Sequence, residues 1–140
     1  MKLHYIIVFV LLIATSGCNS VDDNGLEGSW GIIEFKMIQG GNEVMNSTTK
    51  NLTDAGAVWD LNFYKNGEFR QDFNMRNPQM EIETEKGSWS ISGDSIKIVL
   101  VSDTLTTKMN YTYKINNDTL NLSLTHPISK SSVRTIFTKK

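Results

Sequence analysis

Residues 107–116, Thr-Lys-Met-Asn-Tyr-Thr-Tyr-Lys-Ile-Asn, alternate between polar and apolar side chains. One face of an extended chain would then carry the apolar residues Met109, Tyr111, Tyr113 and Ile115. A period of two is typical of a β-strand with one dry face and one wet face. The same alternation recurs along most of the chain from Trp30 onward, so the sequence predicts an all-β fold.

Runs of this kind, divided by turn signals, predict eight strands. They cover residues 29–38, 57–64, 68–75, 81–91, 95–101, 107–116, 119–125 and 132–139. Within the fourth run the apolar residues change parity, so we expect a β-bulge at Gly87. Glu81, Glu83 and Glu85 share one face of this run, and we expect them to point to water.

The connections between these runs alternate in length. Tight turns cover residues 65–68, 92–94 and 116–118, and longer connections cover residues 39–56, 77–80, 102–106 and 126–131. Because alternate connections of a meander lie at opposite ends, one end should be closed and the other open. Eight such strands most economically form an antiparallel up-and-down β-barrel, which leaves no exposed edge. We expect residues 39–56 to form a lid with a hinge at Gly40 and Gly41.

The N-terminus has the pattern of a secretory signal peptide, with Lys2, an apolar run over residues 5–14 and small residues before Cys18. This arrangement resembles the lipobox of bacterial lipoproteins, whose cysteine is acylated after cleavage. We therefore expect a signal peptide over residues 1–17, a lipidated Cys18 and tether over 18–25, and a barrel domain over 26–140. The protein would be lipid-anchored in the cell envelope, in the outer membrane, and would face the periplasm or the cell surface. The alternative is an ordinary cleaved leader followed by a stray cysteine.

Three motifs in a fixed order carry a resemblance to a known family. Gly28-Ser29-Trp30 opens the first strand, Lys-Asn-Gly-Glu-Phe follows at 65–69, and Gly-Ser-Trp-Ser-Ile-Ser-Gly-Asp follows at 87–94. Together they resemble the short bacterial lipocalin-like lipoprotein domains, over nearly all of the chain after residue 26. The resemblance implies a lipocalin-like barrel that binds or carries a small hydrophobic ligand.

The resemblance also implies a structural signature at the closed end, where the first-strand tryptophan of lipocalins packs against a basic residue of the last strand. Gly28 and Trp30 match the first strand of this signature. Arg134 is the candidate basic residue, and Lys139 is an equally good candidate by position.

The inward faces of the predicted barrel are heavily aromatic. The candidate ligand-binding residues are Trp59, Phe63, Phe73, Trp89, Met109, Tyr111 and Tyr113. An eight-stranded barrel is wide enough either to be filled or to hold one small ligand. The alternative function is therefore a filled barrel lipoprotein that binds a protein or a glycan as an accessory or inhibitor module.

Little in the sequence favours catalysis. His126 is the only histidine after the leader, and a single histidine does not make a metal site or a catalytic triad. The formal net charge is −1 with scattered basic residues, which disfavours nucleic acid as a partner. We expect a protein that is not an enzyme, holds no metal or cofactor, and has a small hydrophobic molecule and the membrane as partners. The sequence does not specify a protein partner.

Overall fold

The computed structural model describes residues 25–140. The predicted signal peptide, Cys18 and nearly all of the tether lie outside the described residues. The elements are β1 (Gly28–Gln39), β2 (Asn42–Ser47), α1 (Thr49–Asp54), β3 (Trp59–Phe63), β4 (Glu68–Phe73), β5 (Glu83–Ser92), β6 (Ser95–Val101), β7 (Thr106–Asn116), β8 (Thr119–Thr125) and β9 (Ser132–Lys139). Between Gly25 and Lys140, no helix is long and apolar enough to span a bilayer.

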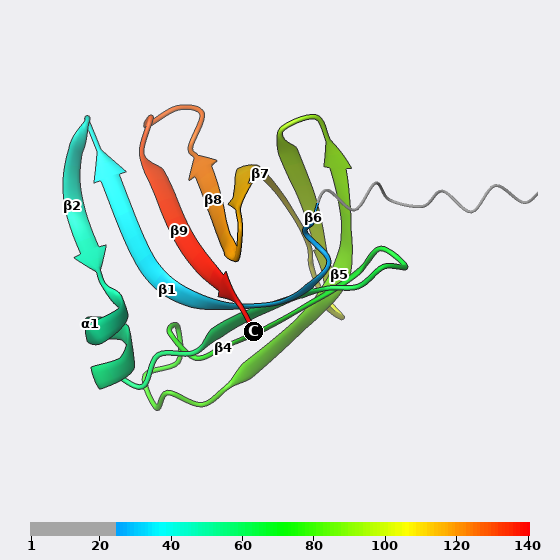
Figure 1. Cartoon of the computed structure of the whole chain (residues 1–140), viewed down its shortest axis with the longest axis horizontal. Helices are drawn as coiled ribbons and strands as arrows, with labels where there is room; N and C mark the ends of the chain where they lie inside the picture. Colours follow the sequence, from blue (N-terminus) through cyan, green and yellow to red (C-terminus); the bar gives the residue numbers. More distant parts are fainter. Residues whose placement is uncertain (1–24) are drawn as a thin grey trace, which may run out of the picture.

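An antiparallel sheet curves round and closes on itself, with β9 lying beside β1 (Figure 1). The strands follow one another in the order β1, β3, β4, β5, β6, β7, β8, β9, and β9 returns to pair with β1. This closed eight-stranded barrel confirms the predicted fold class. One edge of β1 pairs with β9. Its other edge is long enough to pair with two strands, β3 near the start of β1 and β2 near its end.

The prediction that residues 39–56 form a hinged lid is wrong, because they contain a strand and a helix. Gly40 and Gly41 both have positive φ and form the tight turn of a β1–β2 hairpin, a conformation that glycine adopts without strain. The helix α1 follows, with Leu52 as its buried residue. Its start is stabilised by the Thr48 backbone N–H, which donates to Asn51 Oδ1 over 3.3 Å. This segment is therefore an ordered extension of the barrel wall.

The two ends of the barrel differ as the connection lengths predict. The tight turns carry positive-φ residues at Gly67, Gly93 and Asn117, and they gather at the end where β1 begins and β9 finishes. We call this the closed end. The opposite end, which we call the mouth, carries the β1–β2 turn and the connections 55–58, 74–82, 102–105 and 126–131.

The hydrophobic core occupies the inside of the barrel from the closed end to the last residues of β6. Its buried residues are Leu26, Trp30, Leu61, Phe63, Phe69, Trp89, Ile96, Ile98, Leu100, Leu120, Leu122 and Phe137. Trp30 is fully buried, and its indole Nε1 donates to the carbonyl of Leu26 over 2.8 Å. This hydrogen bond fixes the chain at the closed end, just before β1 begins. The closed barrel and this core lie entirely within residues 26–140.

The predicted β-bulge at Gly87 is wrong, because β5 pairs without a register shift with both of its neighbours. Gly87 lies opposite Phe69 on β4 and Leu100 on β6. A Cβ atom at this position would lie 1.8 Å from the Val99 carbonyl oxygen. Glycine is therefore needed for the close approach of two strands. The register shifts lie instead in β1, against β2 and β9.

A buried asparagine joins two connections at the mouth. Asn74 is 3% exposed, and its Oδ1 accepts a hydrogen bond from the Val58 backbone N–H over 2.8 Å. Its Nδ2 donates to the carbonyls of Gly56 at 2.9 Å and Met80 at 3.3 Å. One side chain thus satisfies backbone groups of two segments far apart in sequence, which fixes this side of the mouth.

Candidate ligand site at the mouth

The inward-facing side chains differ in exposure. The predicted site residues Trp59, Met109, Tyr111 and Tyr113 lie against the core but remain partly exposed. On β1, Phe35 and Met37 pair with interior residues of β9 and are also partly exposed. Several apolar side chains of the inner face are therefore only partly covered by the core.

Two other predicted site residues belong to the buried core. Phe63 and Trp89 are 2% and 3% exposed. The Phe63 ring lies 5.1 Å from the ring of Phe69 and 5.5 Å from that of Trp89, in tilted and edge-on arrangements that aromatic pairs prefer. The indole Nε1 of Trp89 donates to the carbonyl of Tyr64 over 2.9 Å. These residues are part of the packed core.

The remaining aromatic residues connect the inner face to polar groups. The Trp59 ring packs edge-on against Phe137 at 5.5 Å, and its Nε1 donates to Gln71 Oε1 over 3.0 Å. Phe73 is buried near the mouth, and the guanidinium of Arg76 lies 4.3 Å from the centre of its ring. The apolar wall at this side is therefore continuous with a hydrogen-bonded cluster.

Of the three glutamates expected to point to water, Glu81 is exposed, whereas Glu83 and Glu85 are partly exposed on the inward face of β5. Glu83 and Glu85 share the face of β5 that carries the core residue Trp89, since no bulge intervenes. Gln71 Nε2 donates to Glu85 over 2.6 Å, and Arg76 lies 2.8 Å from Glu85 and 3.6 Å from Glu83. The Arg76 side chain is 65% exposed, and those of Glu83 and Glu85 are 44% and 31% exposed, so these ion pairs lie in contact with solvent. We call Gln71, Arg76, Glu83 and Glu85 the polar corner.

Tyr111 lies on β7, which β6 separates from β5. Its hydroxyl donates to the sulfur of Met109 over 3.2 Å. Burial and, to a smaller extent, the negative charge of Glu85 together raise the pKa of Tyr111 to about 12. The phenol is therefore a neutral hydrogen-bonding group at physiological pH. An apolar wall with one polar corner suits a small molecule that has an apolar body and a single polar group.

At the closed end, Lys139 and not Arg134 is the basic partner of the first-strand tryptophan. The Lys139 Nζ lies 5.2 Å from the centre of the Trp30 ring, within cation–π range. Arg134 lies on the outer face of β9, where it donates to Asn121 Oδ1 over 2.8 Å. Gly28 has a φ of +118°, and a Cβ there would lie 3.3 Å from Lys139 Cε, so glycine makes room for the lysine stem.

No protein-family model matches the sequence, and no curated protein matches it. Among solved structures, a lipocalin-like protein from Bacteroides uniformis superposes with a TM-score of 0.55 and 17% identity, over 82% of this chain and 98% of that one. The chain has a lipocalin-like fold. An uncharacterized protein from Bacteroides eggerthii superposes with a TM-score of 0.53 and 14% identity, over 81% and 98% of the two chains.

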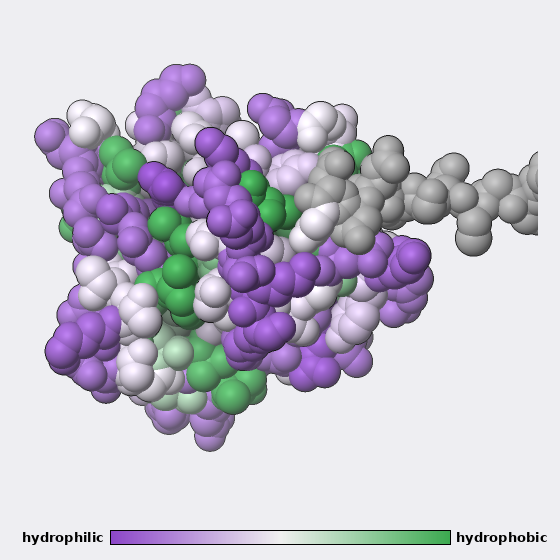
Figure 2. All heavy atoms as spheres, viewed as in Figure 1, coloured by the Kyte–Doolittle hydropathy of each residue, from purple (hydrophilic) through white to green (hydrophobic). Residues whose placement is uncertain are grey.

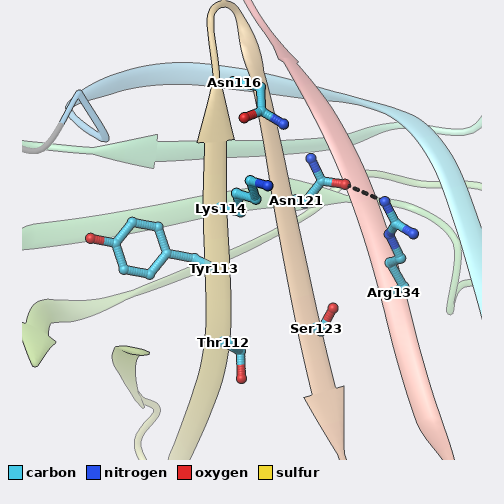
Figure 3. Close-up of a pocket in the computed structure, with 7 residues that line it drawn as sticks. All are labelled: Thr112, Tyr113, Lys114, Asn116, Asn121, Ser123 and Arg134. Atoms are coloured by element: carbon cyan, nitrogen blue, oxygen red, sulfur yellow. Dashed lines mark hydrogen bonds between the residues drawn. The ribbon is translucent and has the colours of Figure 1, made fainter. Parts of the chain in front are cut away.

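The wall of the lipocalin-like barrel is recessed at several places, two of which involve residues named above. A groove of about 310 Å³ crosses β7, β8 and β9, and Figure 3 shows the ring of Tyr113 pointing away from the hydrogen-bonded pair of Asn121 and Arg134. The groove is lined by Thr112, Tyr113, Lys114, Asn116, Asn121, Ser123 and Arg134. A recess of about 250 Å³ lies where β1 parts from β3, and it includes Ile32 and Trp59.

The only histidine in the described part of the lipocalin-like barrel stabilises a turn. His126 Nδ1 accepts hydrogen bonds from the backbone N–H groups of Ile128 at 3.3 Å and Ser129 at 3.2 Å. Within residues 25–140, no group of three or more His, Cys, Asp and Glu side chains could hold a metal ion.

Proposed function

We propose that this protein binds a small hydrophobic molecule on the interior wall of the mouth and acts by binding rather than by catalysis. The observation that carries the proposal is the partial exposure of Trp59, Met109 and Tyr111 on the inner face, where they pack against the core. Apolar side chains are normally buried in a filled barrel, and a ligand would cover those that remain exposed.

The ligand class follows from the chemistry of the wall. Aromatic and methionine side chains are suited to flat or flexible apolar bodies, such as sterols and acyl chains. The polar corner would hold one hydrogen-bonding group of such a ligand, with Glu85 and Arg76 available as partners. The bound molecule would therefore lie with its polar group toward β4 and β5.

We further propose that lipid on Cys18 holds the protein in the outer membrane of the cell envelope. The leader pattern supports this location, and the described chain enters the barrel at the closed end beside Leu26. The mouth would then face away from the anchor. Inhibition of the lipoprotein signal peptidase should shift the protein's gel mobility, and an unchanged mobility would refute the lipidation.

A paired set of tryptophan substitutions on β7 tests the ligand site. Met109→Trp places a larger side chain on the interior wall, whereas Asn110→Trp places the same side chain on the outer face of the strand. We expect the interior variant to bind an apolar fluorescent probe about tenfold more weakly or worse, because it fills the site. The outer variant should bind like the wild type. Equal binding by both variants would contradict the proposed site.

The outer groove supports a second candidate function, a filled barrel that recognises a glycan. Lys114, Arg134 and Asn121 present hydrogen-bond donors in this recess, and saccharides offer hydroxyl and carboxylate acceptors. Glycan binding that is lost in Arg134→Ala, with the apolar probe unaffected, would favour this candidate. Retained glycan binding in that variant would exclude the groove as the site.

A further inference from the structure

The outer surface of the last four strands carries positive charge only. Its exposed cations on β6, β7 and β9 are Lys97, Lys108, Lys114 and Arg134. The strands β6, β7, β8 and β9 contain no aspartate or glutamate. The carboxylates of the connections before and between them belong to Asp94, Asp103 and Asp118. Because these four strands are adjacent in the sheet, their outward side chains form one surface, which we call the basic face.

Strand pairing brings the four cations close together. Lys97 and Lys108 lie on neighbouring strands, two residues apart in register. Asn121 pairs with Lys114 and accepts a hydrogen bond from Arg134 over 2.8 Å, so it lies between these two cations (Figure 3). With strands about 4.8 Å apart and a rise of about 3.3 Å per residue, neighbouring cations lie roughly 8–14 Å apart. A polymer lying across the face would meet several of them at once.

These cations are not neutralised by carboxylates of the barrel. Among the ion pairs of residues 25–140, none involves a cation of the basic face. The adjoining strand β1 differs, since its Lys36 is paired with Glu34 and Glu43. Lys36 also lies directly opposite Arg134 on β9. Like charges opposite one another are unfavourable in a sheet, and a bound anion would offset their repulsion.

We propose that the basic face binds an anionic polysaccharide. Sulfate or carboxylate groups repeat along such polymers, and guanidinium and ammonium groups bind both through charge-assisted hydrogen bonds. Asn110, Thr112 and Ser123 lie among the cations, and their amide and hydroxyl groups suit the hydroxyls of a sugar chain.

Other classes of partner fit this face less well. A protein interface is depleted of charge at its centre and anchored by aromatic side chains, and single-stranded nucleic acid stacks its bases on aromatic rings. The outward positions of β6–β9 carry no aromatic residue, and the ring of Tyr113 points away from Asn121 and Arg134 (Figure 3). On the side of the molecule shown in Figure 2, hydrophilic side chains predominate and hydrophobic ones form patches between them.

The inference deepens the second candidate function, because it rests on glycan recognition at the outer groove and specifies the charge of the glycan. It does not depend on the ligand site at the mouth. The formal net charge of the whole chain is −1, so a polyanion is not attracted by net charge. Binding would therefore report the arrangement of the cations.

Matched polymers test the proposal. A chain beginning at Asn19 keeps the whole barrel and its core but lacks the leader and Cys18. Calorimetric titration compares dextran sulfate and polygalacturonate with unmodified dextran as the neutral control. We expect both anionic polymers to bind, more weakly as salt is added, and unmodified dextran not to bind. The tighter of the two anionic polymers then assigns sulfate or carboxylate as the favoured group. No binding of either would overturn the proposal.

Two double variants remove the same charge from different places. Lys114→Gln with Arg134→Gln removes two cations from the basic face, whereas Lys50→Gln with Lys65→Gln removes two exposed cations from α1 and the β3–β4 turn. We expect the first variant to bind dextran sulfate about tenfold more weakly or worse, and the second to bind within about twofold of the wild type. Urea unfolding checks that each variant is folded. Equal weakening of both would show a general charge effect and overturn the proposal.

Protection from acetylation, followed by mass spectrometry, locates the contact on the unmodified sequence. We expect dextran sulfate to protect Lys97, Lys108 and Lys114 and to leave Lys50 and Lys65 reactive. Uniform protection of these five lysines, or protection of the last two alone, would contradict binding at the basic face.

The outcomes separate this proposal from the two proposed functions. Met109→Trp fills the ligand site on the inner face and should bind dextran sulfate like the wild type. Unmodified dextran binding as tightly as dextran sulfate would keep the outer groove as a glycan site but overturn the requirement for negative charge. Tighter binding to single-stranded DNA or to phosphatidylglycerol vesicles than to either anionic polysaccharide would assign the face to nucleic acid or to lipid, and would also overturn the proposal.

Discussion

Replacing Gly87 by alanine tests the continuous strand ladder that turns the β5 glutamates into the barrel. The added Cβ would lie 1.8 Å from the Val99 carbonyl oxygen, 2.8 Å from its carbonyl carbon and 3.0 Å from the Cα of Leu100. All of these are backbone atoms, so no flexible side chain can move aside. The strands would have to separate by about 1 Å or more to restore ordinary contact.

The expected loss of stability follows from this separation. Overpacking costs about 1–3 kcal/mol, and weakening one or two ladder hydrogen bonds adds about 1 kcal/mol each. The lower backbone entropy of unfolded alanine offsets about 0.5–1 kcal/mol of this. We therefore expect Gly87→Ala to lower the free energy of unfolding by about 2–4 kcal/mol, a large part of the stability of a small domain.

Urea unfolding followed by tryptophan fluorescence measures this loss from the midpoint and the slope. Ser90→Ala is the control, because Ser90 lies on the same strand with an exposed side chain and should change stability by about 0.5 kcal/mol or less. Equal stability of the two variants would refute the reasoning, because a bulge at Gly87 would leave space for the methyl group.

Three further predictions concern the mouth, the closed end and the interior. Asn74→Ala should cost about 2–3 kcal/mol in urea unfolding, because it leaves three backbone groups at the mouth without their partner; a loss below about 1 kcal/mol would contradict this. Lys139→Met should lose about 0.5–1 kcal/mol of cation–π stabilisation. Arg134→Met should lower the free energy of unfolding by less. A larger loss for Arg134→Met than for Lys139→Met would indicate that Arg134 is the basic partner of Trp30. Because its pKa is raised in the fold, Tyr111 should make the protein less stable as pH rises from about 10 to about 12, as the unfolded chain loses its proton first. Glu85→Gln should lower the Tyr111 pKa measured by ultraviolet titration, and an unchanged value would remove Glu85 as a cause.

The barrel could be predicted because its signals are local. Alternation with a period of two identified every strand of the closed ring, and turn residues such as Gly67 and Gly93 marked the closed end. The extra strand β2 and helix α1 were missed, because six residues each give little periodicity. Gly40 and Gly41 are compatible with either a hinge or a tight turn, so composition alone did not decide between them.

The polar corner could not be predicted because it depends on contacts between strands. The expected bulge used the parity of Ile82, but that residue lies before the start of β5. The constraint at Gly87 is the backbone of the neighbouring strand, which a single sequence does not reveal. By contrast, Lys139 shares the parity of the buried Phe137 and Arg134 does not, so strand alternation alone would have selected the lysine.

Native mass spectrometry of the chain beginning at Asn19, purified from the producing organism, tests the central claim most directly. We expect the folded protein to carry an additional small mass that is lost on denaturation and is absent or much reduced in Met109→Trp. The Asn110→Trp control should retain it. A bare polypeptide mass that persists after incubation with fatty acids and sterols would contradict ligand binding at the mouth.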